Sequence, residues 1–366
     1  MVNKVNIKIK NVLLKLEEKG FKAYVVGGFV RDYLLGNASY DVDIATSAQP
    51  KDIKEIFDLN SSTDDNYGSV YFKDSLYNYD ITTFRREEKY ESRKPVEFNY
   101  IDSIEEDVKR RDFTINALYM DSDGNIIDLV DGKKDLENKT IRVIGDIETK
   151  MIEDPLRMLR AIRFSSLLEF ELDPNLYNYI RRNRQLIRTL SYTRKKEELD
   201  SIFNDQNKLR GINLIKDLGI EDDLEIEIPK DIKIVDRELG IWAQITYSDN
   251  YQFKNNDLSK IEDIKKVVGY GIIDNIVLYE CGLYVCMIAG EILGISMSYI
   301  SDIYKNLPIY SVKDIVINGN DIMEILNLEP SEKIKDIIFD IEINILNNNL
   351  KNEKDELKTY LIENWR

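Results

Sequence analysis

The chain has 366 residues, 43% of them hydrophobic, a formal net charge of −16 and no histidine. This length exceeds what one compact domain usually holds, so several units are expected. The lack of histidine excludes Ser-His-Asp triads and histidine metal sites, which leaves such chemistry to carboxylates, Lys, Tyr or Arg. The acidic balance argues against a protein that coats nucleic acid nonspecifically, but it permits a local basic track.

No apolar run is expected to reach the length that spans a membrane, and the N-terminus lacks the pattern of a signal peptide. Cys281 and Cys286 stand in an apolar stretch. Two buried thiols are predicted, because zinc would need more ligands and a disulfide scaffold more cysteines. These features favour a reducing cytoplasm.

The N-terminal stretch alternates between helical and strand patterns. Helices are predicted at residues 5–19 and 50–57, and strands at 21–26 and 40–46. Between the two strands lie a glycine turn and a short helix. This order predicts the start of an α/β head of roughly 130 residues.

Asp41 and Asp43 alternate along the second strand, so their side chains point to the same face and can bind the same Mg²⁺ ions. Gly27 and Gly28 have no side chain to keep a phosphate from the backbone N–H groups, and a helix N-terminus follows them. Paired carboxylates beside a phosphate-binding turn predict transfer from a nucleoside triphosphate. One metal would activate the attacking hydroxyl, and the other would neutralise the triphosphate and the leaving pyrophosphate.

A hairpin is predicted from strands at 68–72 and 77–84, after a polar loop at 59–66. Asp80 on its second strand is a candidate third carboxylate. Three carboxylates without metal would repel one another, so metal should stabilise the head. The charged stretch 85–95 is expected to be an exposed loop, with a strand at 96–101.

Residues 109–120 combine charge with small hydrogen-bonding groups and end in a strand that turns at 121–124. In this segment Arg111 suits phosphate, whereas Asp112 and Asn116 suit ribose hydroxyls. A surface cluster of salt bridges is the alternative interpretation.

From residue 152 most of the chain has helical periodicity. Asp154, Arg157, Arg160 and Arg163 are three residues apart and are predicted to share one helix face. Asp154 and Arg157 could read the Watson–Crick edge of a base, with an i,i+3 ion pair as the alternative. Arg160 and Arg163 would then face the triphosphate, because this run offers the arginines no matching acids.

A second group of seven basic residues, called the basic cluster below, could follow phosphates along an RNA. It comprises Arg181, Arg182, Arg184, Arg188, Arg194, Lys195 and Lys196. Beyond about residue 217 the chain becomes acidic and then continues in amphipathic helices. No internal repeat has a solenoid period.

The motif at 26–36 with Asp41 and Asp43 resembles the nucleotidyltransferase signature of the DNA polymerase beta superfamily. Residues 110–117 and 153–164 are similar to class II tRNA nucleotidyltransferases, the bacterial CCA-adding enzymes and their poly(A) polymerase relatives. The stretch around Asp80 is similar to the family's strand with the third carboxylate. Residues 307–323 and 352–354 resemble the tail domain of bacterial CCA-adding enzymes.

The resemblance implies a seahorse-shaped molecule with an α/β head, a mixed sheet with helices, followed by an all-α neck, body and tail. The boundaries would be 1–130, 131–200, 201–300 and 301–366. It implies CTP and ATP as substrates, the tRNA 3′ end as acceptor, Mg²⁺ on Asp41 and Asp43, and Asp154 with Arg157 as the base template. The implied nucleotide contacts are Gly27, Gly28, Arg31, Asp32, Arg111, Asp112, Asn116, Asp154, Arg157, Arg160 and Arg163.

Several alternatives remain open. A partial adder (CC-only or A-only) or a poly(A) polymerase would share these motifs. The stretch 85–95 matches a flexible loop that CC-only members shorten, and the polar stretch 59–68 argues against the poly(A) form. A non-catalytic tRNA-binding module would not need its intact aspartates, and a small-molecule transferase would leave the basic cluster unexplained. Residues 193–195 are Thr-Arg-Lys, where family members often have Glu-Arg-Ile. This difference is expected to affect the binding of tRNA.

Overall fold

The computed structural model describes residues 6–59, 68–91 and 94–366. Contacts divide the chain into two compact units, Met1–Glu225 and Ile226–Arg366. This agrees with the expectation of several units, whereas the four boundaries drawn from the sequence stay a prediction. The predicted loop at 59–66 lies outside the described residues, apart from Leu59.

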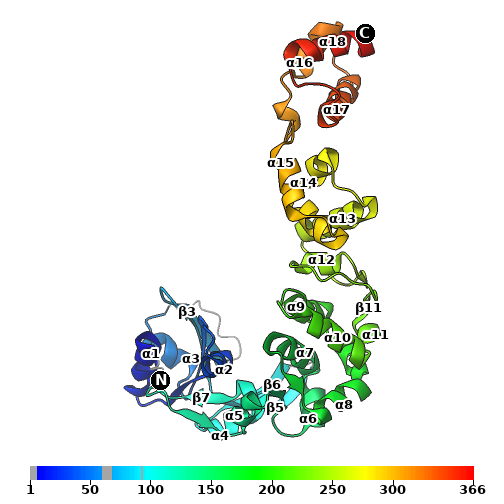
Figure 1. Ribbon diagram of the computed structural model, residues 1–366. Coiled ribbons are helices and arrows are strands. Elements are labelled where there is room, and N and C mark those ends of the chain that lie inside the picture. The colour runs from blue at the N-terminus through cyan, green and yellow to red at the C-terminus, as the bar shows by residue number, and fades with distance from the viewer. Residues whose placement is uncertain (1–5, 60–67, 92–93) are drawn as a thin grey trace. The chain divides into compact units, whose positions relative to one another are not determined.

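The first unit contains a six-stranded mixed sheet in the order β3-β4-β2-β1-β7-β8 (Figure 1). Its strands are β1 Ala23–Val26, β2 Asp41–Thr46, β3 Ser69–Lys73, β4 Asn78–Thr83, β7 Leu118–Met120 and β8 Ile126–Asp128. Only β2 and β4 pair in parallel; the other neighbours are antiparallel. Helices α1 Ile7–Glu17, α2 Gly28–Leu35 and α3 Pro50–Ile56 pack against the sheet. The predicted α/β head is therefore confirmed.

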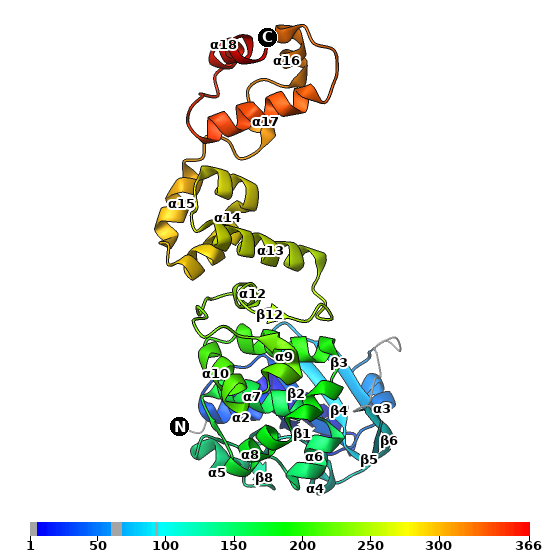
Figure 2. The ribbon, with the colours of Figure 1, turned by 90° about the vertical axis from the view of Figure 1, so that its right-hand side faces the viewer.

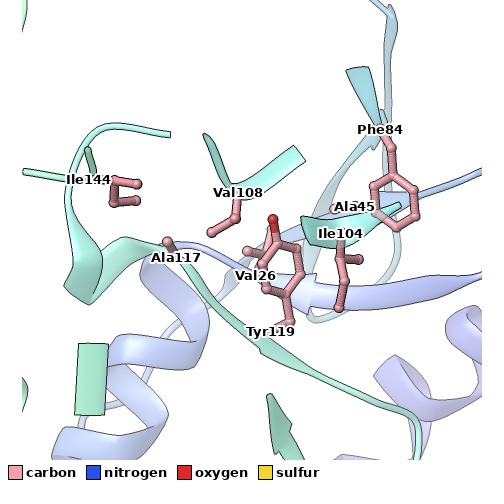
Figure 3. Close-up of a cluster of buried hydrophobic side chains, with 8 residues drawn as sticks. All are labelled: Val26, Ala45, Phe84, Ile104, Val108, Ala117, Tyr119 and Ile144. Carbon is pink, nitrogen blue, oxygen red and sulfur yellow. The ribbon is translucent and has the colours of Figure 1, made fainter. Parts of the chain in front are cut away.

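A hydrophobic cluster lies where the sheet meets α4 Ile104–Asp107 and the 3-10 turn η2 Val108–Arg110. Figure 3 shows the ring of Tyr119 within this cluster, with its hydroxyl on the side where Val108 lies. The cluster consists of Val26, Ala45, Phe84, Ile104, Val108, Ala117, Tyr119 and Ile144. It fixes the segment after η2, which includes Arg111 and the 3-10 turn η3 Thr114–Asn116, against the sheet.

The stretch expected to be a loop at 85–95 instead forms strands β5 Arg85–Glu91 and β6 Lys94–Tyr100. They pair antiparallel, from Arg85 opposite Tyr100 to Glu91 opposite Lys94, with register shifts between Glu87 and Tyr90. The expectation was wrong because it gave weight to charge, whereas ladder pairing is a backbone property. The expected strand at 96–101 is confirmed by β6.

Most of the remaining first unit is helical, and α7, α9 and α10 pack together (Figure 2). The helices and 3-10 turns are α5 Gly132–Glu137, α6 Ile147–Glu153, α7 Leu156–Leu168, α8 Pro174–Arg182, η4 Arg184–Thr189, α9 Tyr192–Phe203, α10 Lys208–Leu218 and α11 Glu221–Leu224. Strands β9 Thr140–Ile141 and β10 Glu171–Leu172 form a short parallel pair.

The second unit is almost entirely helical. It contains α12 Glu238–Trp242, α13 Asn255–Tyr270, α14 Asn275–Leu293, α15 Met297–Lys305, η5 Val312–Asp314, α16 Gly319–Leu326, α17 Lys333–Leu346 and α18 Lys354–Trp365. The short strands β11 Ile226–Glu227 and β12 Thr246–Tyr247 pair antiparallel.

Helix α14 contradicts the expectation that no apolar run reaches membrane-spanning length, because its 19 residues qualify by length and composition. Gly282 within it has φ 76° and ψ 163°, which is not helical, so two shorter helices meet there. Soluble core helices pass the same test, so α14 is weak evidence for a membrane span. Cys281 is half-buried and Cys286 buried, both as free thiols.

Candidate active site

Three aspartates lie on the two parallel strands at the centre of the first unit's sheet. In the register of β2 and β4, Asp43 stands opposite Asp80 and Asp41 opposite Asn78. The Asn78 Nδ2 donates a hydrogen bond to Asp41 Oδ1 at 2.7 Å. Val42 and Ile44 of β2 are buried, so the alternation turns Asp41 and Asp43 to the other face. Asp80 therefore lies beside the pair, as expected.

The carboxylates repel one another electrostatically. Desolvation by the surrounding protein and then the charge of Asp80 raise the pKa of Asp43 to about 6. Asp43 remains exposed, so this desolvation comes from the concave surroundings rather than from full enclosure. Desolvation also raises the pKa of Asp80, against the hydroxyls of Tyr71, Thr82 and Ser69, which lower it.

Gly27 supplies the space that Asp43 needs. Its φ is 75°, in the left-handed region, and a Cβ there would lie 2.6 Å from Asp43 Oδ2. Both conformation and space therefore require glycine. This turn begins α2, as the motif predicted.

The aspartate oxygens are the hard donors that Mg²⁺ prefers. Among the described residues, no three His, Cys, Asp or Glu side chains gather into a ready-made metal cage. Mg²⁺ usually takes one or two protein carboxylates, with substrate phosphates and water completing its shell. The donor chemistry of Asp41 and Asp43, and the raised pKa of Asp43, therefore fit a cation.

A cavity of about 540 Å³ opens beside Asp43. Its lining joins the glycine turn, the segment after η2 and the start of α7, and is rich in arginine. The lining residues are Gly27, Gly28, Arg31, Asp43, Arg85, Arg110, Arg111, Asp112, Asn116, Asp154, Arg157, Arg160 and Phe164. Ten of the predicted site residues thus meet in one cavity, whereas Asp32, Asp41, Asp80 and Arg163 lie outside this lining.

Arg31 and Asn116 come from distant segments and bind each other in the cavity wall. Arg31 is 5% exposed and donates through Nη1 to Asn116 Oδ1 at 2.8 Å. Its Nε and Nη2 donate to the two carboxylate oxygens of Asp32. The Asn116 Nδ2 is buried and has no hydrogen-bond partner in the part of the chain that the structure describes. A buried unpaired donor that lines a cavity suits a polar ligand group.

Asp107 holds two of the cavity's arginines, and sequence reasoning missed it. This fully buried carboxylate pairs with Arg110 Nε at 2.7 Å and Arg111 Nη2 at 2.9 Å, and accepts from the Tyr119 hydroxyl. Burial acts to raise its pKa, but the charges of Arg111 and Arg110 outweigh burial and lower the pKa to about 2. Its spacing before the two arginines, i,i+3 and i,i+4, was the available signal.

Asp154 and Arg157 do not share a helix, contrary to expectation. Helix α6 ends at Glu153 and α7 begins at Leu156, and Asp154 between them is extended (φ −146°, ψ 95°). Pro155 disfavours helical backbone at the residue before it. Arg157 is buried and donates to the carbonyl oxygens of Lys150 and Arg110 and to Glu153. Both side chains nevertheless line the same cavity.

The expectation that the α7 arginines lack matching acids is wrong, because acids reach them from other segments. Arg160 donates through Nε and Nη2 to Asp112 Oδ2. Arg163 pairs with Glu198 of α9, Nη1 to Oε2, at 3.3 Å. Burial raises the pKa of Glu198 and lowers that of Arg163. The role of Arg163 as a nucleotide contact stays a prediction.

Comparisons with known proteins agree with this geometry. Residues 23–142 match the model of the poly A polymerase head domain, and residues 259–361 match the model named tRNA nucleotidyltransferase domain 2 putative. A CCA-adding enzyme of Ligilactobacillus salivarius is 35% identical, over 96% of this chain and 94% of its own length. The chain belongs to the CCA-adding enzyme family.

A second CCA-adding enzyme, from Listeria monocytogenes, is 33% identical over 98% of this chain and 99% of its own length. The solved CCA-adding enzyme of Bacillus stearothermophilus in complex with CTP superposes with a TM-score of 0.86. It is 26% identical and covers 98% of this chain and 96% of its own length. CCA-adding membership makes the chain an enzyme, which excludes the non-catalytic tRNA-binding module.

In this member of the CCA-adding enzyme family, most of the basic cluster is already paired. Arg184 and Arg188 both pair with the buried Asp223. Lys195 is 1% exposed and donates to the Asp223 carbonyl oxygen at 3.1 Å. Arg194 pairs with Glu197, and Lys196 with Asp200. A continuous track of seven cations is therefore not what the fold presents.

Proposed function

We propose that the chain adds C, C and A to the 3′ end of tRNA from CTP and ATP, by Mg²⁺-dependent transfer without a nucleic-acid template. The observation that carries the proposal is the register of Asp43 with Asp80 beside a cavity lined by six arginines. The names of the relatives support the same reaction. The free thiols support a cytoplasmic location.

Asp41 and Asp43 are the proposed metal ligands, with Asp80 as the third carboxylate. When bound, two Mg²⁺ ions would lower the pKa of the attacking hydroxyl and neutralise the triphosphate and the pyrophosphate. The negative charge of Asp80 makes the electrostatic potential at Asp43 more negative. Asn78 orients Asp41 through its amide.

Different residues of the cavity wall bind the phosphates, the ribose and the base of the nucleotide. Arg31, Arg111 and Arg160 are placed to bind phosphate oxygens, because each is held at one edge by a carboxylate. The Asn116 Nδ2, which has no partner among the described residues, donates to a ribose hydroxyl. Asp154 and Arg157 serve as base template, with Arg157 held in place by two backbone carbonyls.

The decisive assay incubates the protein with Mg²⁺, CTP and ATP on a tRNA that lacks its last three nucleotides. Sequencing should find C, C and A added, followed by a stop. Addition of only C residues, or only A after a supplied CC end, would replace the proposal with a partial adder. A added to an unrelated oligoribonucleotide, with no C incorporated, would refute it. Asp41→Ala should abolish transfer and keep the circular dichroism spectrum.

The template role is tested with Arg157→Ala, which should blur the choice among CTP, ATP and other triphosphates. Arg210→Ala is the matched control, because Arg210 also donates to two backbone carbonyls but lies in a different cavity. Unchanged selectivity in Arg157→Ala, or equal loss in both variants, would count against the template role.

A further inference from the structure

Three guanidinium groups converge on one aromatic ring at the cavity. The carbon Cζ of Arg31 lies 5.4 Å from the ring centroid of Phe164, that of Arg160 lies 5.3 Å away, and that of Arg163 lies 4.8 Å away. Phe164 is 7% exposed and is the one aromatic side chain among the described lining residues. Phe113 meets its ring edge-on, with centroids 5.7 Å apart.

The three arginines are positively charged and repel one another, and the aromatic ring between them offsets part of this repulsion. The positive charges of Arg160 and Arg31 both lower the pKa of Arg163, after the larger effect of burial. Among the described residues, Arg31 pairs with one carboxylate, Asp32; Arg160 pairs with Asp112, and Arg163 pairs with Glu198. An aromatic face carries negative potential and attracts a cation placed over it.

The carboxylates and the ring constrain different parts of each guanidinium. Asp112 binds Arg160 through Nε and Nη2, which leaves Nη1 without a hydrogen-bond partner among the described residues. A carboxylate fixes one edge of the planar group, but the group can still pivot about that edge. The Phe164 ring limits the pivot because it is itself buried against Phe113.

We propose that Phe164 is a positioning residue for the nucleotide's triphosphate. Its ring aligns Arg31 from α2 with Arg160 from α7, so that both guanidinium groups meet the same phosphate chain. The inference rests on the proposed function, since it requires a nucleoside triphosphate in this cavity. Phe164 takes no part in the chemical step, so its loss should weaken nucleotide binding far more than the catalytic rate.

The test measures CTP binding to the full chain without tRNA, by titration calorimetry with Mg²⁺. Phe164→Leu and Phe164→Met remove the ring at similar volume and should raise Kd about 10-fold, as two cation–π contacts at the lower, solvent-screened end of their range would. The kcat should stay within about threefold. Phe164→Tyr keeps the ring, so its Kd should stay near the wild-type value.

Phe170→Leu is the matched control. Phe170 is buried just beyond the end of α7, and Arg210 donates to its backbone carbonyl and not to the ring. Its replacement should lower the melting temperature as Phe164→Leu does, with CTP affinity within about twofold of wild type. Equal loss of affinity in both leucine variants would reduce Phe164 to a packing role.

A double-mutant cycle completes the test. In an Arg160→Lys background, Phe164→Met should raise Kd only about threefold, because the Arg160 contact is already gone and only the Arg31 contact is left to lose. Full additivity, or wild-type affinity in both ring-free variants, would overturn the inference. If the wild-type protein binds neither CTP nor ATP, the proposed function fails instead.

Discussion

Replacing Asp43 with Asn should stabilise the metal-free protein above pH 6, although it removes a proposed metal ligand. The fold raises the pKa of Asp43 from 3.8 to about 6. The folded state therefore holds a proton between these values that the unfolded state has lost, so stability falls as pH rises through this window. The shift corresponds to about 3 kcal/mol at face value. Solvent screening of an exposed group reduces this to about 1 kcal/mol.

For a unit of this size, about 1 kcal/mol raises the melting temperature by about 2–4 °C. The assay is thermal unfolding of wild type and Asp43→Asn at pH 4 and pH 7.5, with and without Mg²⁺. The gain should appear only at pH 7.5, and Mg²⁺ should stabilise only the wild type. Asp102→Asn, which removes an exposed partner of Lys22, should show neither effect. An Asp43→Asn variant that melts lower at pH 7.5, or responds to Mg²⁺ like wild type, would refute the reasoning.

Two further substitutions test the walls of the site. Gly27→Ala should lower nucleotide incorporation about 100-fold, because the alanine Cβ would displace Asp43 Oδ2. The control is Gly20→Ala, which is also at positive φ but in open space and should leave incorporation intact. Asp107→Asn should cost about 3–5 kcal/mol of unfolding free energy in urea, by leaving Arg110 and Arg111 without their buried partner. Because its folded pKa is about 2, the wild-type contribution should be lost as pH falls from about 4 toward 2.

The sequence was most informative where chemistry depends on neighbours in the chain. The alternation of Asp41 with Asp43 predicted a shared strand face, and β2 has that form. The strand pattern around Asp80 predicted its place beside them, which the register confirms. Local rules suffice here, because side-chain direction in a strand follows from period two.

Other features depended on partners far along the chain. The acids that meet Arg160 and Arg163 come from Asp112 and Glu198, which helical spacing cannot reveal. The effect of Pro155 on the backbone of Asp154 is visible in the sequence, but the spacing of the arginines at i,i+3 favoured one continuous helix. The contact of Phe164 with Arg31 could not be predicted, because it joins side chains of α2 and α7 that are far apart in the chain.

The pairing of the basic cluster fixes how steeply its RNA binding should respond to salt. A cation that neutralises a phosphate releases counterions, which changes the slope of log K against log salt by about −0.7 for single strands. Seven independent cations would contribute a slope of about −5. An arginine that leaves Asp223 for a phosphate only exchanges one anion for another, so it releases little. Lys195 is buried and donates to a carbonyl oxygen, so among the described residues only Arg181 and Arg182 of the cluster have neither an acidic partner nor such burial. The cluster should therefore contribute a slope near −1.4. Its contribution to RNA affinity should fall less with added salt than that of seven unpaired cations.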